Sequence, residues 1–175
     1  MEKANGNDGV AGTNEQLFQF SLAAEREASD FYRFLEGVFP SHPEVAAFWA
    51  RMRRDEEKHV EELSRIHAGI PANLLAAAAD AGILAQASRI ARFGLLERAA
   101  GLENLDQAYE LAHRLENSEI ATVFSFIREK FIPHCAQKNF TLSMLDEHLD
   151  WIMSLPRRLG DREVRRAIAL EKPRE

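Results

Sequence analysis

The apolar residues of this chain recur at the 3.6-residue spacing of an amphipathic α-helix in four long segments, and no stretch shows the sustained alternation of a half-buried strand. The four segments are residues 15–39, 43–67, 104–131 and 133–155. Proline, which cannot continue a helix interior, follows each segment within a few residues. Asn104 begins an N-L-D-Q sequence with the spacing of a capping box. The pattern predicts an all-α fold.

The connections between these segments predict how the helices are arranged. Short links join the first segment to the second and the third to the fourth, so each pair is expected to be antiparallel. About 35 residues separate the second segment from the third and read as short helices joined at Gly82, Gly94 and Gly101. One long crossover of this kind is typical of a ferritin-like four-helix bundle.

The domain organisation predicted from this pattern is a single bundle with two tails. We expect a flexible tail over residues 1–14, the bundle over 15–155, and an Arg-rich tail or short helix over 156–175. The Arg-rich segment fits a solvated helix, a docking arm or a contact with an anionic surface.

Composition limits the class of protein. A chain of 175 residues suits one core, and a net charge of −6 argues against nucleic acid as a partner. Membrane insertion is not expected, because no apolar run approaches the length of a membrane span. The first fifteen residues lack an apolar signal core, so we expect a cytoplasmic protein. The single Cys135 excludes a disulfide framework or a cysteine-based zinc or rubredoxin site.

Each long segment carries ionisable residues on the apolar stripe that it is expected to bury. These residues are Glu25, Glu56, His59, Glu116, Glu119 and His148. Burying a lone carboxylate costs several kcal/mol, and no Lys or Arg lies in the middle of the first three stripes before Lys130. One or two divalent metal ions would supply the missing positive charge. Glu56 and His59 suit this role, because residues three apart project from one helix face about one turn apart.

A simpler explanation exists for each feature taken singly. A lone Glu-x-x-His is more often a surface feature than a ligand pair, and an acid beside an apolar stripe usually lies on its margin. Tyr32 and Trp151 are most simply core aromatics. The coincidence of central polar positions on four helices favours a metal site over these readings.

Three of the segments resemble helices of the rubrerythrin family of ferritin-like di-iron carboxylate proteins. They are LAAEREASDFY (22–32), RRDEEKHVEEL (53–63) and AYELAHRLENSEIATVF (108–124). The resemblance implies Glu25 as a terminal ligand, Glu56 as a bridging ligand and His59 as an imidazole ligand. It also implies Glu116 and Glu119 as an E-x-x-E ligand pair, with His148 as a second imidazole and Tyr32 beside the metals.

The function implied by the resemblance is an iron oxidoreductase. Such a protein would bind one or two irons, with zinc or manganese as alternatives, and would reduce hydrogen peroxide or oxygen. Electrons would come from a separate donor, because a rubredoxin domain needs four cysteines. The alternative is a non-catalytic bundle that binds one metal, for example zinc, or none, and acts as an interaction module.

A second apolar strip on the first helix bears on assembly. Phe20, Phe31 and Val38 lie away from the Glu25 face and need cover from the crossover or from another chain. From this strip we expect a homodimer.

The fourth segment departs from the family pattern at Leu145, where an acid three residues before His148 is expected. Without that bridging ligand, less anionic charge offsets the repulsion between two dications. We therefore predict fewer than two metals per chain at modest metal concentration and slow iron oxidation by peroxide. Leu145→Glu should raise metal content toward two and speed that oxidation. Metal analysis and stopped-flow absorbance test this, and two tightly held irons in the unmodified protein would contradict it.

Overall fold

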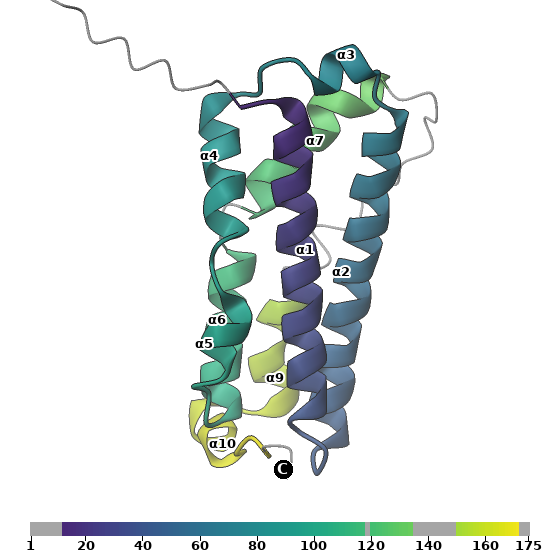
Figure 1. Ribbon diagram of the computed structural model, residues 1–175. Helices are drawn as coiled ribbons and strands as arrows, with labels where there is room; N and C mark the ends of the chain where they lie inside the picture. Colours follow the sequence, from purple (N-terminus) through teal and green to yellow (C-terminus); the bar gives the residue numbers. More distant parts are fainter. Residues whose placement is uncertain (1–11, 118–119, 135–149, 172–175) are drawn as a thin grey trace, which may run out of the picture.

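The computed structural model describes residues 12–117, 120–134 and 150–171, and in these ranges every regular element is a helix (Figure 1). The elements are α1 (Asn14–Gly37), α2 (Pro43–Gly69), α3 (Ala72–Leu75), α4 (Ala81–Ile90), α5 (Leu95–Ala99), α6 (Leu105–Glu116), α7 (Ile120–Phe131), the 3₁₀ turn η1 (Ile132–His134), α9 (Leu155–Leu159) and α10 (Arg162–Ala167). The predicted all-α class is therefore confirmed. None of the described helices has the length and apolar composition of a transmembrane segment.

The long helices α1 and α2 form an antiparallel pair joined by a short loop (Figure 1). Thr13 starts α1 with a capping box, in which Thr13 and the side chain of Gln16 each satisfy the other's backbone N–H group. Helix α2 starts at Pro43, whose fixed φ suits the first turn and whose missing N–H group is not needed there. The capping turn therefore lies within the segment expected to be a tail.

The crossover runs along α1 from the far end of α2 to the start of α6, and α4 and α5 both pack on α1 (Figure 1). Asp80 caps α4 by accepting a hydrogen bond from the N–H group of Ile83. Gly82 lies inside α4, so the joint predicted there is wrong. Gly94 does form a joint, because it precedes α5 with a φ of 68° that favours glycine.

This crossover also covers the second apolar strip of α1. Phe31 is fully buried, Val38 is 3% exposed and Phe20 packs partly buried against the core. Covering the strip therefore needs no second chain, so the strip gives no reason to expect the homodimer.

The third predicted helix is two helices. It was expected to run unbroken from Asn104 to Phe131, but α6 ends at Glu116 with Asn117 as its C-cap, and α7 begins at Ile120. The N-terminal prediction was better, because the side chain of Asn104 caps α6 by accepting from the N–H group of Gln107. The two helices share few contacts.

Most of the fourth predicted helix, residues 135–149, lies outside the described residues. Its described end is fixed by Trp151, which stacks on Phe48 of α2 with 5.3 Å between ring centroids and has guanidinium groups of Arg51 and Arg158 over its ring. Pro156 was expected to end this helix. Instead it occupies the first turn of α9, after a turn at Ser154.

The buried apolar residues form two clusters stacked along the bundle. On α1 one cluster ends at Ala24 and the other begins at Ala28. On α2 the first of these clusters begins at Leu63, and the second ends at Met52. Helices α5 and α6 contribute only to the cluster that contains Ala28, whereas α4 and α7 contribute only to the other. A layer without buried apolar residues on α1 and α2 lies between the clusters, and it contains the polar residues described below.

The Arg-rich C-terminal segment is docked on the bundle. Arg165 of α10 is 5% exposed and donates two hydrogen bonds, of 2.8 and 3.2 Å, to one carboxylate oxygen of Asp106 on α6. Beyond α10, the N–H group of Leu170 donates to Glu103 O, and that of Glu171 donates to Val38 O. This segment therefore ties the start of α6 to the α1–α2 loop.

The ion pair of Asp106 and Arg165 should make stability depend on acid pH. Burial raises the pKa of Asp106, but hydrogen bonds from Arg162 and Arg165 outweigh burial and bring the pKa below its ordinary value of 3.8. Its stabilisation is therefore present above pH 3.8 and is lost as the pH falls through the folded-state pKa. We expect Asp106→Asn to lower the free energy of unfolding by about 2 kcal/mol at pH 7, as measured by urea unfolding. The difference from the unmodified protein should shrink in more acidic buffer.

The matched control is Asp150→Asn, because Asp150 is exposed. It should leave stability within about 0.5 kcal/mol of the unmodified protein. A cost for Asp106→Asn that stays constant down to pH 3 would contradict this account.

Candidate metal centre

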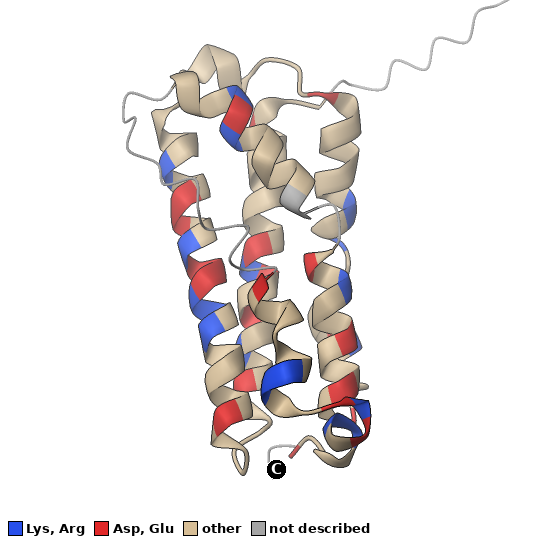
Figure 2. Ribbon diagram, turned by 180° about the vertical axis from the view of Figure 1, so that it is seen from behind, with Lys and Arg blue, Asp and Glu red and all other residues tan. Residues whose placement is uncertain are grey.

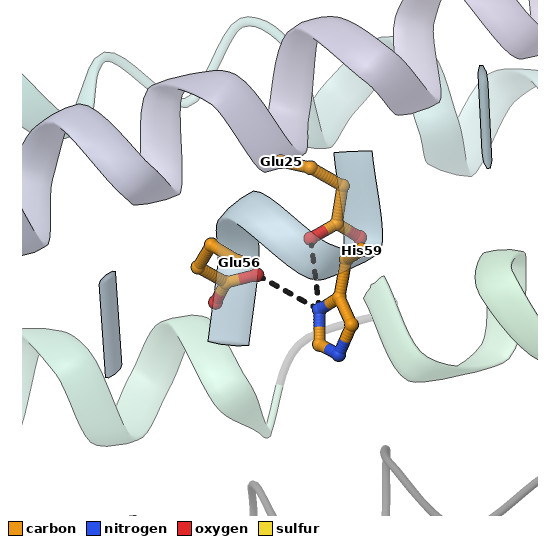
Figure 3. A group of neighbouring side chains, drawn as sticks. All are labelled: Glu25, Glu56 and His59. Carbon is orange, nitrogen blue, oxygen red and sulfur yellow. Dashed lines mark hydrogen bonds and ion pairs between the residues drawn. The ribbon is translucent and has the colours of Figure 1, made fainter. Parts of the chain in front are cut away.

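Three buried side chains from α1 and α2 converge in the polar layer between the two apolar clusters (Figure 3). Glu25 is 2% exposed, Glu56 is 3% exposed and His59 is 2% exposed. One ligand atom from each lies within 4.8 Å of the other two. The structure therefore brings together three of the ligands predicted from the sequence.

The local sequence explains this convergence. Glu56 and His59 are three residues apart in the unbroken helix α2, so they occupy one face about one turn apart. Glu25 is at the corresponding level of α1, which packs along α2 over most of its length. Because both helices are long and continuous, residues at helical spacing stay on the same face from the helix ends to the site.

The imidazole of His59 lies between the two carboxylates. Its Nδ1 atom is 2.9 Å from a carboxylate oxygen of Glu56 and 3.3 Å from one of Glu25. Dashed lines mark both contacts in Figure 3. Burial lowers the pKa of His59, but its hydrogen bonds to Glu25 and Glu56 and their charges outweigh burial and raise it to about 11. Without a metal, a protonated imidazole therefore holds the two carboxylates together at neutral pH.

Burial also affects the carboxylates. It raises the pKa of Glu56 well above its ordinary value, and the nearby charges of Glu25 and Glu116 raise it further, while the hydrogen bond to His59 acts in the opposite direction. A divalent ion in place of the proton would relieve this repulsion, since it carries more positive charge than the imidazolium.

Tyr32 and Glu116 adjoin the three-residue cluster. The Tyr32 hydroxyl donates a hydrogen bond to a carboxylate oxygen of Glu116 across the interior, and the Tyr32 ring stacks on Trp49. Burial, followed by the charge of Glu116, raises the pKa of Tyr32 well above 10. The phenol therefore keeps its proton at neutral pH and fixes the position of Glu116.

The remaining predicted ligands differ in outcome. Glu116 is half-buried rather than at the middle of a buried stripe, and it is not among the three residues whose ligand atoms converge. Glu119 and His148 lie outside the described residues, as does Leu145. Of the six predicted ligands, the structure therefore describes four, which are Glu25, Glu56, His59 and Glu116.

Sequence reasoning missed a buried ion pair one turn beyond His59. Glu62 of α2 is 9% exposed and Arg128 of α7 is 7% exposed, with 3.4 Å between Arg128 Nε and Glu62 Oε1. Burial raises the pKa of Glu62, while the charges of Arg128 and His59 act to lower it. A buried cation therefore lies beside the polar layer before Lys130, although not in the middle of the predicted third stripe.

The break between α6 and α7 explains why the ion pair was not predicted. A wheel drawn through one unbroken helix centres the buried face on Glu116 and places Arg128 about 120° away. In the structure, the buried face of α7 includes Phe124 and Phe131, with Arg128 on its edge. The sequence did contain a signal for this pair. A helical wheel of the segment after Glu116 alone puts Arg128 close to Phe124 and Phe131.

The donor set fits a divalent metal. Carboxylate and imidazole ligands suit iron, manganese and zinc. Two ligands bound at about 2.0–2.2 Å to one ion are at most about 4.4 Å apart, so the three donor atoms, which lie within 4.8 Å of one another, are close to the spacing that one ion requires. These three residues alone leave coordination positions for further ligands.

A small cavity adjoins the cluster between α1, α4 and α7. Its volume is about 10 Å³, close to the minimum for one water molecule. The Glu25 carboxylate and Ser21 supply polar groups, and Ala87, Val123 and Phe124 form part of the apolar wall. A molecule the size of water would fit beside Glu25.

No family model, curated protein or solved structure matches the chain. Function must therefore be inferred from the chemistry of the site itself.

Metal binding at this cluster should release protons. Because the pKa of His59 is raised to about 11, its imidazole carries a proton at neutral pH that a metal bound in its place would displace. Calorimetric titration with Zn²⁺ at pH 7 in buffers of different ionisation enthalpy should show release of about one proton or more per ion. Affinity should rise with pH.

The control for proton release is His59→Ala, which removes the imidazole proton and one ligand. It should bind Zn²⁺ more weakly and release fewer protons. Equal proton release from both proteins would place the ion elsewhere.

Proposed function

We propose that the chain is a rubrerythrin-like protein that binds iron at Glu25, Glu56 and His59 and reduces hydrogen peroxide or oxygen with electrons from a separate donor. The convergence of two buried carboxylates and an imidazole in a polar layer carries this proposal. The sequence resemblance of α1 and α2 to rubrerythrin helices supports iron over other ions that such donors accept.

The protein residues would have distinct roles in this chemistry. Glu25, Glu56 and His59 would hold the metal, and the carboxylates would balance its charge as oxidation state changes. Bound ferrous iron would supply the electrons that break the O–O bond. Tyr32 holds a proton on its hydroxyl, directed at Glu116, in a position to orient that carboxylate. The apolar clusters on either side limit access of bulk water.

The size of the cavity limits what can reach the cluster without a change of structure. The cavity adjoins Glu25, has room for about one water-sized molecule, and is lined mainly by apolar side chains. Peroxide and oxygen, with two heavy atoms each, would need it to widen slightly, whereas a larger organic substrate would require the helices to separate.

The competing function is a non-catalytic bundle that binds one metal, for example zinc, or none. The ion pair of Arg128 with Glu62 favours it, because Arg128 offsets one of the buried carboxylates without a metal. Against it, the charges of Glu25 and Glu56 both act on the imidazole of His59, and the charge of Glu116 acts on Glu56.

Anaerobic loading with ferrous iron followed by peroxide separates these two functions. We expect the iron to be oxidised at a rate that depends on peroxide concentration, and the absorbance of the protein monitors this oxidation. Glu56→Gln should lower iron affinity at least tenfold, because it removes a charged ligand with little change of shape. Glu61→Gln is the matched control, since Glu61 is exposed on the same helix, and it should match the unmodified protein.

Two results would decide against the proposal. Tight zinc binding with no peroxide-driven iron oxidation would establish the non-catalytic metal-binding function. Equal iron affinity for Glu56→Gln and the unmodified protein would exclude this cluster as the iron site.

A further inference from the structure

A surface depression of about 470 Å³ lies where α10 docks on the start of α6, and it shares no lining residue with the metal cluster. Its charged lining residues are Arg98, Asp106, Glu110, Arg114, Arg162 and Arg166. We propose that this depression binds an anion of the phosphate class, either free phosphate or the phosphate group of a larger small molecule. This inference is independent of the proposed iron chemistry.

The first observation is that Asp106 is neutralised without the lining arginines. Arg165 is buried, does not line the depression, and donates two hydrogen bonds to Asp106. Arg162 and Arg166 also contact Asp106, at 3.1 and 3.4 Å, although their side chains are 61% and 59% exposed. Three guanidinium groups thus surround one carboxylate, so Arg162 and Arg166 add positive charge beyond what Asp106 requires.

The second observation is how the lining guanidinium groups are engaged. In the contacts that the structure describes, Arg162 and Arg166 approach Asp106 through Nε. Of the other two lining arginines, Arg98 Nε donates to Phe93 O, and Arg114 Nε donates to Glu110 O. All four contacts use Nε, which leaves the terminal Nη groups of each arginine for a ligand. Terminal guanidinium N–H groups pair well with phosphate oxygens.

The third observation is the local field. The chain carries a net charge of −6, yet the depression has four arginines against two carboxylates. Asn104 and Gln107, at the N-terminal end of the twelve-residue helix α6, also line it. The positive end of this helix dipole adds to the attraction for an anion. In Figure 2, basic and acidic positions gather on the small C-terminal helix at this end of the molecule.

The dimensions favour a small ligand. A volume of about 470 Å³ falls in the range of small-molecule sites, and the arginines come from three separate parts of the chain, around α5, α6 and α10. Arginines that meet in one depression from separate parts of the chain suit a phosphate group better than an extended acidic partner.

Titration of the full chain with inorganic phosphate and with a nucleoside monophosphate, at constant ionic strength, tests the proposal. We expect saturable binding by calorimetry and a rise in the thermal midpoint, because a ligand bound only by the folded state stabilises it. Tighter binding of the monoester would indicate a phosphate group of a larger ligand, and equal binding would indicate free phosphate.

The double variant Arg98→Gln with Arg114→Gln removes charge from the depression without touching Asp106. It should weaken binding at least tenfold while its midpoint without ligand changes little. Arg54→Gln is the control, because Arg54 is exposed on α2 and does not line the depression. His59→Ala should keep phosphate binding, which separates this site from phosphate held by a metal.

Three outcomes would overturn the proposal. One is equal binding by the double variant and the unmodified protein. Another is equal weakening by Arg54→Gln, which would show nonspecific attraction to positive charge. The last is a midpoint that chloride raises as much as phosphate does at the same ionic strength.

Discussion

The free-energy cost of burying carboxylates is the constraint on which the rest of the structure depends. Glu25 and Glu56 are almost completely buried, and a carboxylate in an apolar interior costs several kcal/mol unless positive charge or hydrogen bonds compensate it. Both acids lie in one layer, where His59 contacts each of them. The apolar clusters above and below the layer can then pack without polar interruption.

How far the sequence predicted the site depended on the continuity of each helix. Glu25, Glu56 and His59 were predicted correctly as buried neighbours, because helical periodicity relates residues reliably along the unbroken α1 and α2. Glu116 was placed too centrally and Arg128 was overlooked, because the break after Glu116 changes the phase between α6 and α7. Asn117 favours helix ends only weakly, and it was not used as a stop signal.

Contacts between distant parts of the chain limited the other predictions. The Arg-rich end of the sequence fitted both a solvated helix and a docking arm, because Arg162, Arg165 and Arg166 are alike as sequence positions. Only the position of Asp106, about sixty residues earlier, makes Arg165 the buried partner. Similarly, the apolar strip of α1 showed a need for cover, but periodicity does not specify that the crossover supplies it.

The alignment of the helix breaks with the polar layer has a consequence for the cooperativity of unfolding. Among the described elements, α1 and α2 alone run continuously across that layer, whereas α4 is separated from α5 and α6 from α7 near it. The two halves of the bundle are therefore coupled mainly through these two helices and could open as separate units. An ion held by Glu25, Glu56 and His59 would join both continuous helices at the boundary and make the halves unfold together.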